Sequence, residues 1–286
     1  MDGDILNSVF EAAEQSAESR RNENDYIGED GLLYCGNCRT RKEIIIDREV
    51  AGTHIRRKVP VLCQCEAVKR EKQEEEQRRK DAEDAGRRMR EASLMDDKFF
   101  KATFDSFESN EYNKKNLELC RRYVAKFGKM YEKNQGLLFW GNVGTGKSYA
   151  AACIANRLMD HGVRVIMTSF VKLLENTRVP LREAETMMRL SSAKLVIFDD
   201  LGAERSTDYA LEKTYNIIDS RYRSNKPMIL TTNLTLDEMF AEKDLRYRRI
   251  YDRIFEVCYP VQWTGPSWRI LQAKAKFTEM GKLLGE

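Results

Sequence analysis

The segment 141–148, GNVGTGKS, constrains the fold more than any other stretch, because it has every fixed position of the phosphate-binding pattern G-x-x-x-x-G-K-[ST]. The apolar run 136–140 precedes it and a helical stretch, 148–160, follows it, so strand, loop and helix come in the required order. Glycines let backbone N–H groups approach phosphate oxygens, and a helix N-terminus adds partial positive charge. The sequence therefore predicts an ATP site.

The predicted nucleotide contacts run through this loop into the helix. Lys147 is expected to reach the β- and γ-phosphates, and Ser148 is expected to ligate Mg²⁺ through its hydroxyl. The full set of expected nucleotide-binding residues is Gly141, Asn142, Val143, Gly144, Thr145, Gly146, Lys147, Ser148 and Tyr149.

Two further apolar runs end in polar side chains. Residues 195–200, LVIFDD, read as a strand that delivers Asp199 to the Mg²⁺ shell and places Asp200 to orient or deprotonate the attacking water. Residues 228–232 read as another strand, after which Asn233 is placed to hydrogen-bond the γ-phosphate or the lytic water. By themselves, such residues also form ordinary turns and helix caps.

The order of apolar and helical stretches predicts the fold class. Strands at 163–168, 194–198 and 228–232 alternate with helical segments, which indicates an α/β fold with a parallel central sheet flanked by helices. An aromatic cluster at 99–107 reads as a lead-in that packs on this domain, and 112–134 reads as a helix. The expected organisation is a polar N-terminal segment (1–30), a zinc-binding module (31–65), a charged helical linker (66–98) and the ATPase domain (99–286).

The linker is defined by its charge. Residues 66–91 carry 9 acidic and 9 basic side chains, many as acid-then-base pairs four residues apart, which supports a solvated helix. Because the segment has no apolar heptad, a spacer between modules is favoured over a coiled coil.

Four of the seven cysteines form two close pairs in the N-terminal module. Cys35 and Cys38 are separated by 24 residues from Cys63 and Cys65, close to a zinc-ribbon arrangement, and four thiolates close a tetrahedral Zn²⁺ site. His54, in a basic hairpin, is an alternative ligand. A closed site leaves no open position for catalysis. The other three lie in apolar contexts typical of a core: Cys120, Cys153 and Cys258.

Composition narrows the class of protein. The net charge is only +3, so any nucleic-acid contact must come from a local patch. The chain has no signal-peptide core and no run near 18 apolar residues, which predicts a cytoplasmic protein without membrane contact.

The motifs GNVGTGKS, LVIFDDLGAE, MILTTN, RIYDRI and GPSWR, in this order, resemble the AAA+ ATPases of the DnaC/DnaI/IstB group, which are helicase loaders and transposition ATP-binding proteins. The resemblance runs from about Phe99 to the C-terminus. It implies that Asn233 is sensor 1, that Arg269 is sensor 2, and that Arg253 is the arginine finger that reaches a neighbouring subunit's γ-phosphate. Two alternatives are that Arg249 is the finger, or that these arginines only form a solvated basic helix face with Arg246 and Arg248. The implied catalytic set is Lys147, Asp199, Asp200, Asn233, Arg253 and Arg269.

One departure from many AAA+ proteins concerns the catalytic carboxylate. The strand ends in Asp199-Asp200, with Glu204 further on, where many members have Asp-Glu. The catalytic carboxylate is therefore either Asp200 or Glu204. A strand that ends in Asp-Asp also fits a slow ATPase that acts as a switch.

The resemblance implies a loader of a DnaB-type replicative helicase onto single-stranded DNA, with ATP-dependent self-association. The cysteine module resembles the zinc-binding regions with which DnaI-like and phage loaders dock on the helicase, although its basic hairpin equally permits a nucleic-acid contact. Phe170 and Lys172 are candidate strand contacts, with ordinary helix surface as the alternative. Two other functions stay open: an IstB-like transposition protein, and a zinc-containing nucleic-acid-binding protein that ATP switches with negligible turnover. A metabolic kinase is not supported, because the sequence has no signature of an acceptor-substrate site.

Overall fold

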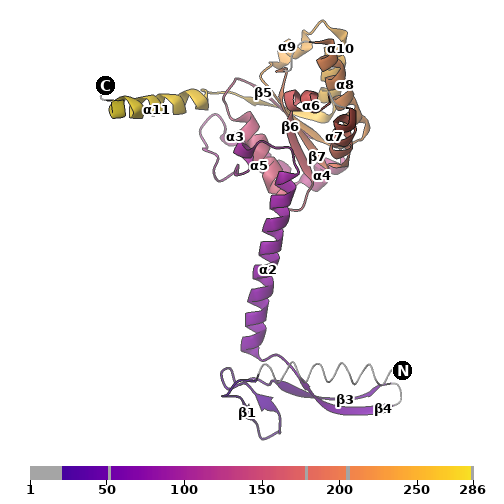
Figure 1. Cartoon of the computed structure of the whole chain (residues 1–286), viewed down its shortest axis with the longest axis vertical. Helices are drawn as coiled ribbons and strands as arrows, with labels where there is room; N and C mark the ends of the chain where they lie inside the picture. Colours follow the sequence, from indigo (N-terminus) through magenta and orange to yellow (C-terminus); the bar gives the residue numbers. More distant parts are fainter. Residues whose placement is uncertain (1–20, 51–52, 178–179, 204–206, 285–286) are drawn as a thin grey trace. The chain divides into compact units, whose positions relative to one another are not determined.

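The computed structural model describes residues 21–50, 53–177, 180–203 and 207–284 (Figure 1). The chain divides into two compact units, Met1–Asp81 and Ala82–Glu286. Residues 1–20 of the expected polar N-terminal segment lie outside the described residues.

The first unit is built from two small antiparallel sheets and the start of a long helix. Strands β1 (Tyr26–Ile27) and β2 (Leu33–Tyr34) pair with each other, and β3 (Glu43–Val50) and β4 (Thr53–Pro60) form a hairpin. Helix α2 (Gln64–Glu91) then begins directly after Cys63. Cys35, Cys38 and Cys63 therefore lie in the connections next to these strands, and Cys65 lies in the first turn of α2.

Helix α2 is the helix that the charge pattern predicts. Its exposed side chains pair along the helix, as in Arg70–Glu74 at 2.8 Å and Lys80–Glu76 at 2.9 Å. Because water and salt screen such exposed pairs, each contributes little to stability.

The second unit holds a parallel five-stranded sheet in the order β6-β7-β8-β5-β9. Its strands are β5 (Gly136–Gly141), β6 (Val165–Ser169), β7 (Leu195–Leu201), β8 (Met228–Thr232) and β9 (Cys258–Trp263). The strand order places β8 between β5 and β7. The phosphate-loop strand and the acidic strand are therefore separated by the strand that ends next to Asn233.

Helices cover both faces of this sheet, as the sequence predicts (Figure 1). One core contains side chains of α3 (Lys114–Ala125), α4 (Phe127–Glu132) and α5 (Lys147–Asp160). The other contains side chains of α6 (Phe170–Asn176), α7 (Pro180–Ser192), α8 (Asp208–Arg223), α9 (Leu236–Phe240) and α10 (Leu245–Val257). The short helix η1 (Asp97–Phe99) precedes α3, and α11 (Trp268–Leu284) ends the described chain.

Alternation along the central strands explains how one sheet serves two cores. In β7, Leu195 and Ile197 enter the first core, whereas Val196 and Phe198 enter the second. Because strand side chains point alternately to opposite faces, a continuous apolar run is what a strand covered on both sides requires.

Two elements differ from the sequence expectation. The helix expected over 112–134 is two helices, because the backbone of Lys126 leaves the helical region and Phe127 turns into the core near Tyr123. Strand β9 was not predicted at all. It contains Pro260 and lies at the sheet edge, where a residue without an N–H is tolerated.

A buried arginine fixes the starts of the two strands that lead to the polar site. Arg221 of α8 is buried and donates to the carbonyl oxygens of Ala193 and Lys194, just before β7, at 2.9 Å each. It also donates to the carbonyl of Pro227, just before β8, at 2.7 Å. One guanidinium therefore ties the start of β7 to the start of β8.

Among the described residues, every helix is too short or too polar to cross a membrane.

We expect Arg221→Met to lower the free energy of unfolding of the second unit by about 3 kcal/mol, because several buried carbonyls lose a charged donor. Urea unfolding followed by tryptophan fluorescence reports on this unit, since all three tryptophans, Trp140, Trp263 and Trp268, belong to it. Arg189→Met, at an exposed ion pair with Glu185, is the matched control and is expected to change stability by less than about 1 kcal/mol. Equal losses in both variants would contradict the role given to Arg221.

Candidate nucleotide-binding site

The phosphate loop lies between β5 and α5, and its glycines take conformations that other residues avoid. Gly141, Gly144 and Gly146 have φ values of 117°, 78° and 96°. A Cβ on Gly146 would come within 2.8 Å of the Phe107 ring, and one on Gly144 within 2.1 Å of the Ser267 hydroxyl. The loop is therefore held in a tight backbone path by segments on both sides of it in the sequence.

Lys147 is buried at the centre of the site. Its Nζ donates to the carbonyl oxygens of Gly141 at 2.8 Å and Asn142 at 2.6 Å, and to Oδ1 of Asn233 at 2.9 Å. An ammonium removed from water needs such acceptors. The geometry thus joins the loop lysine directly to the residue predicted after β8.

A second set of hydrogen bonds joins Asn233 to the paired carboxylates. Asn233 Nδ2 donates to Asp200 Oδ1 at 3.0 Å. The Thr231 hydroxyl donates to Asp199 Oδ1 at 2.7 Å and accepts the backbone N–H of Asp200 at 2.8 Å. Lys147, Asn233 and Asp200 therefore form one chain of contacts, and Thr231 orients both aspartates.

The charges of the site shift one another's pKa values. Burial lowers the pKa of Lys147 to about 8, and the nearby Asp200 and Asp199 oppose this effect. Burial and the neighbouring Asp199 raise the pKa of Asp200 above its ordinary value. Arg269 acts on both groups, lowering the pKa of Lys147 and favouring the ionised form of Asp200. Four sequence-predicted residues, Lys147, Asp199, Asp200 and Arg269, thus share one electrostatic environment.

A divalent cation would find suitable oxygen donors here. Ser148 lies in the first turn of α5, and Asp199 ends the buried part of β7. A hydroxyl, a carboxylate, phosphate oxygens and waters are the hard ligands that Mg²⁺ takes. Glu204, the other candidate carboxylate, lies outside the described residues.

The segment after β9 closes over the loop. Trp263 accepts the Asn142 N–H through its carbonyl at 3.2 Å, and the Trp268 N–H donates to the Gly144 carbonyl at 2.9 Å. Arg269 follows directly, at the start of α11. The last predicted site residue is therefore anchored to the phosphate loop by backbone hydrogen bonds.

A hollow of about 220 Å³ adjoins the phosphate loop. Its walls come from the loop itself, from the lead-in segment and from the start of α11, and they include Phe107, Tyr112, Thr145, Gly146, Tyr149, Pro266 and Trp268. Aromatic walls next to a phosphate cradle suit a flat base. The residues outside the loop were not predicted, because nothing in the sequence connects Phe107 with a loop that begins 34 positions later.

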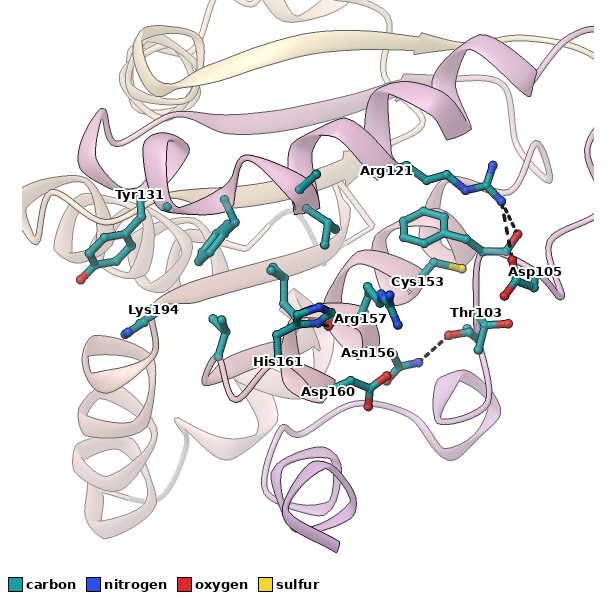
Figure 2. Close-up of a pocket in the computed structure, with 18 residues that line it drawn as sticks. Thr103, Asp105, Arg121, Tyr131, Cys153, Asn156, Arg157, Asp160, His161 and Lys194 are labelled. Atoms are coloured by element: carbon teal, nitrogen blue, oxygen red, sulfur yellow. Dashed lines mark hydrogen bonds and ion pairs between the residues drawn. The ribbon is translucent and has the colours of Figure 1, made fainter. Parts of the chain in front are cut away.

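A larger hollow, about 720 Å³, lies elsewhere on this unit, among α3, α4 and α5 (Figure 2). Its lining includes Arg121, His161 and Lys194 but no residue of the phosphate loop. On its wall the buried Asn156 donates to the carbonyls of Phe99 and Ala102 at 2.8 Å each, which fastens the lead-in segment. Size alone therefore does not identify the nucleotide site.

The predicted arginine finger is held within its own chain. Arg253 of α10 forms an ion pair with Asp219 at 2.7 Å and donates to the Tyr215 hydroxyl at 2.9 Å. Its guanidinium also lies over the Tyr215 ring, 4.7 Å from the centroid, and its side chain is 21% exposed. Arg249, the alternative, is exposed on the same helix. The structure does not bring Arg253 into the Lys147 network.

The structure places the two candidate contacts to single-stranded DNA in different surroundings. Phe170 is fully buried and stacks on Phe198 at 5.1 Å, so the expectation that it contacts DNA was wrong. Phe170 begins α6 directly after β6, and its ring packs into the core. The local sequence pattern does not reveal this. Lys172 is on the surface and pairs with Asp96.

The four cysteines of the first unit lie together. Sγ of Cys35 is 3.6 Å from Sγ of Cys65, which is 3.3 Å from Sγ of Cys63, and all four sulfurs lie within 4.8 Å of one another. Sulfurs around a tetrahedral zinc ion with Zn–S bonds of 2.3 Å are about 3.8 Å apart. The donor set therefore fits a closed Zn²⁺ site, and His54 is instead 2.9 Å from Asp47 on the hairpin.

The surroundings of the cluster also suit a metal. The Thr40 hydroxyl accepts the N–H of Gln64 at 2.9 Å and lies 3.0 Å from Cys38 Sγ. The Thr40 hydroxyl and the backbone N–H groups of Cys65 and Thr40 lower the pKa of Cys38 to about 5, whereas burial raises the pKa of Cys63. Nearby, the buried Lys42 pairs with Asp25 at 2.8 Å and joins the strands to α2 through Glu66 at 3.1 Å.

Comparison with known families gives one match over most of the chain. The model described as "IstB-like ATP binding protein" matches residues 64–276. Among curated proteins, the chain is 28% identical to the phage-like element PBSX protein XkdC of Bacillus subtilis over 48% of this chain and 54% of that protein. It is 26% identical to the replicative helicase loader DnaC of Buchnera aphidicola over 54% of this chain and 64% of that protein. The chain thus spans little more than half the length of these relatives.

Solved structures support the fold. A DnaI crystal structure superposes with a TM-score of 0.51 at 25% identity, covering 61% of this chain and 94% of that chain. A structure of the DnaC helicase loader gives a TM-score of 0.52 at 23% identity, covering 59% and 100%. The predicted AAA+ fold and the resemblance to the DnaC/DnaI/IstB group are confirmed.

We expect ATP affinity to fall as the pH rises through about 8, the pKa of Lys147 in the free protein. Phosphate binding favours the charged ammonium, so binding is strongest below this pKa and weakens by up to about tenfold per pH unit above it. Fluorescent-nucleotide titrations between pH 6.5 and 9.5 measure this dependence. Lys147→Arg should keep binding nearly constant over the range, and a wild-type profile that is equally flat would contradict the assignment.

We expect one zinc ion per chain, measured by mass spectrometry of the metal in purified protein. Cys63→Ser should lose it, because a buried sulfur of the cluster is removed. Cys120→Ala, at a buried cysteine of the other unit, is the control and should keep it. Equal zinc content in both variants would rule out the cluster as the site.

Proposed function

We propose that this chain, which belongs to the family of IstB-like ATP-binding proteins, is an ATP-dependent loader that places a DnaB-type replicative helicase on single-stranded DNA. A curated relative is the replicative helicase loader DnaC of Buchnera aphidicola, and a solved DnaI structure superposes on this chain. The observation that carries the loader proposal over other roles in the family is the separate cysteine cluster ahead of the ATPase unit. It gives the chain a compact module for docking on a helicase.

The Lys147 network supports a nucleotide-responsive site. Lys147 donates a hydrogen bond to Asn233, and Asn233 donates one to Asp200. A γ-phosphate that takes Lys147 as its partner competes with Asn233 for the same ammonium. The amide is then available to the phosphate or to the attacking water, and Asp200 is freed to act on that water. Binding of ATP is thereby coupled to the position of the residues that act in hydrolysis.

The remaining groups complete the proposed reaction. Mg²⁺, held by Ser148 and Asp199, would supply charge neutralisation at the phosphates. The hollow beside Phe107 and Trp268 would take the base. Arg253 would reach the phosphate of a neighbouring protomer, so that turnover depends on self-association. Asp200 keeps the general-base role, with its raised pKa favouring proton acceptance.

A transposition role is the second candidate, and the family description is the observation that favours it. Such a protein would assemble with ATP on duplex DNA and activate a transposase. The two functions differ in the partner and in the DNA, and both use the same ATP site.

The test is helicase loading with purified components. The full chain, the replicative helicase of its host and ATP are added to forked DNA coated with single-strand-binding protein, and unwinding is measured. We expect unwinding to depend on this chain, to be lost with Lys147→Ala, and to persist with Lys129→Ala, an exposed lysine of the same unit. Cys63→Ser should lose helicase capture while it retains nucleotide binding.

Other outcomes decide between the candidates. Unwinding that does not respond to this chain, together with ATP-dependent capture of a transposase on duplex DNA, would replace the loader proposal with the transposition role. Helicase loading that Lys147→Ala leaves intact would show that the nucleotide is not what drives the protein.

A further inference from the structure

The larger hollow among α3, α4 and α5 is an elongated groove. Figure 2 shows Tyr131 and Lys194 at one end of it and Arg121 at the other. Arg157 and His161 lie between these ends. Its volume of about 720 Å³ falls within the range of roughly 300–1,000 Å³ that is usual for ligand sites. The groove is therefore a second candidate binding site on the ATPase unit, separate from the phosphate loop.

The inner surface of the groove is largely apolar. Phe127 and Leu158 are buried in its wall, and Val124 and Val163 line it while only partly buried. Gly128 adds open space, because a Cβ at this position would meet no atom within 4 Å. An occupant therefore gains from filling the groove only if it brings apolar side chains.

The walls of the groove are strongly basic. They are formed by the lead-in segment 101–105, helices α3 and α4 with their connection (114–132), the end of α5 with the turn after it (157–164), and Lys194. With histidine counted as neutral, these residues include ten basic and four acidic side chains. This excess of six is larger than the +3 of the entire chain. The local field thus favours a negatively charged occupant.

Some of these charges are already paired and others are not. Asp160, on the wall, pairs with Arg90 at 2.6 Å, so its carboxylate is neutralised by an arginine outside the groove. Arg157 and Lys194 are exposed, and their side chains form no ion pair within the part of the chain that the structure describes. Both cations are therefore available to carboxylates of an occupant.

The aromatic rings of the groove already have partners. Arg121 lies over the Phe104 ring, 5.4 Å from its centroid, and donates to the Phe104 carbonyl at 3.1 Å. Phe127 contacts the rings of Tyr123 and Tyr131, with centroids 6.1 and 6.2 Å away. Single-stranded nucleic acids bind by stacking bases on open ring faces. Apolar side chains combined with carboxylates need no such faces, so the groove suits an acidic peptide better than a nucleic acid.

We propose that this groove docks a partner protein through a peptide segment that is both acidic and apolar. The apolar side chains of the segment pack on Phe127 and Leu158. Its carboxylates pair with Arg121, Arg157 and Lys194, which are spread along the groove and so match an extended or helical segment in place of one compact anion.

This docking surface goes beyond the proposed function. It lies at the end of α5 opposite to Lys147, about 20 Å along the helix from the phosphate loop. It also uses no residue of the cysteine cluster. The chain would therefore have a partner site on the ATPase unit itself, in addition to the nucleotide site.

The test begins with short random peptides displayed on phage and selected on the full chain. We expect the enriched peptides to combine apolar residues with several carboxylates. A fluorescent copy of one such peptide should bind at least about tenfold more weakly when its Asp and Glu are replaced by Asn and Gln. No enrichment, or enrichment of peptides without an excess of acidic residues, would overturn the proposal.

Two variants then locate the binding of the fluorescent peptide. Gly128→Phe fills the open part of the groove and Arg157→Glu reverses a charge at its middle, and each should weaken binding at least about tenfold. The matched controls are Gly281→Phe, at another helical glycine with open space around it, and Arg182→Glu, at an exposed arginine of α7. Binding that is equal in the groove variants and the controls would overturn the proposal.

Binding of a fluorescent ATP analogue and of oligothymidine is measured in the same samples. All four variants should bind the nucleotide as the unaltered chain does, which shows that they are folded. Loss of oligothymidine binding in the groove variants, with peptide binding unchanged, would overturn the peptide in favour of a nucleic-acid contact. The loader proposal is judged by unwinding, so either proposal can fail without the other.

Discussion

The buried ammonium of Lys147 is the interaction on which the site depends. It is satisfied by two carbonyls of its own loop and by Asn233, which arrives from a strand more than 80 residues later. The desolvation that lowers its pKa also makes it a strong partner for any phosphate that replaces these acceptors. Without a nucleotide, the Lys147 ammonium is therefore paired with acceptors of the protein that a bound phosphate can replace.

The strand order makes this arrangement possible. Because β8 lies between β5 and β7, the residue after β8 falls between the phosphate loop and the paired aspartates. Thr231, at the end of β8, then ties Asp199 and the backbone of Asp200 to the same strand. Far from the site, Arg221 holds the starts of β7 and β8 together. The geometry of the carboxylates is thus set at both ends of two neighbouring strands.

The elements that could be predicted from the sequence are those whose residues are adjacent in the chain. The strand, loop and helix around Lys147 and the charged helix α2 are read from adjacent residues, and the close cysteine pairs predicted the cluster. Strand β9 escaped prediction because Pro260 and its half-exposed alternation resemble a loop, and only its place at the sheet edge makes it a strand. The Phe107 wall and the Asp219–Arg253 pair join segments dozens of residues apart, so no local pattern contains them.

Lys147 and Arg253 resemble each other in how the protein holds their charge. Each is a cation withdrawn from water and held by a partner of its own chain, Asn233 in one case and Asp219 with Tyr215 in the other. For Arg253 to reach a phosphate of a neighbouring copy, the guanidinium has to leave Asp219, so the incoming phosphate and the docked neighbour must together outweigh an ion pair already made. In the proposed loader, turnover would then require both nucleotide and assembly, because Arg253 would leave Asp219 only for the phosphate of a neighbouring copy. This exchange of partners would account for the slow, switch-like ATPase that the sequence predicts.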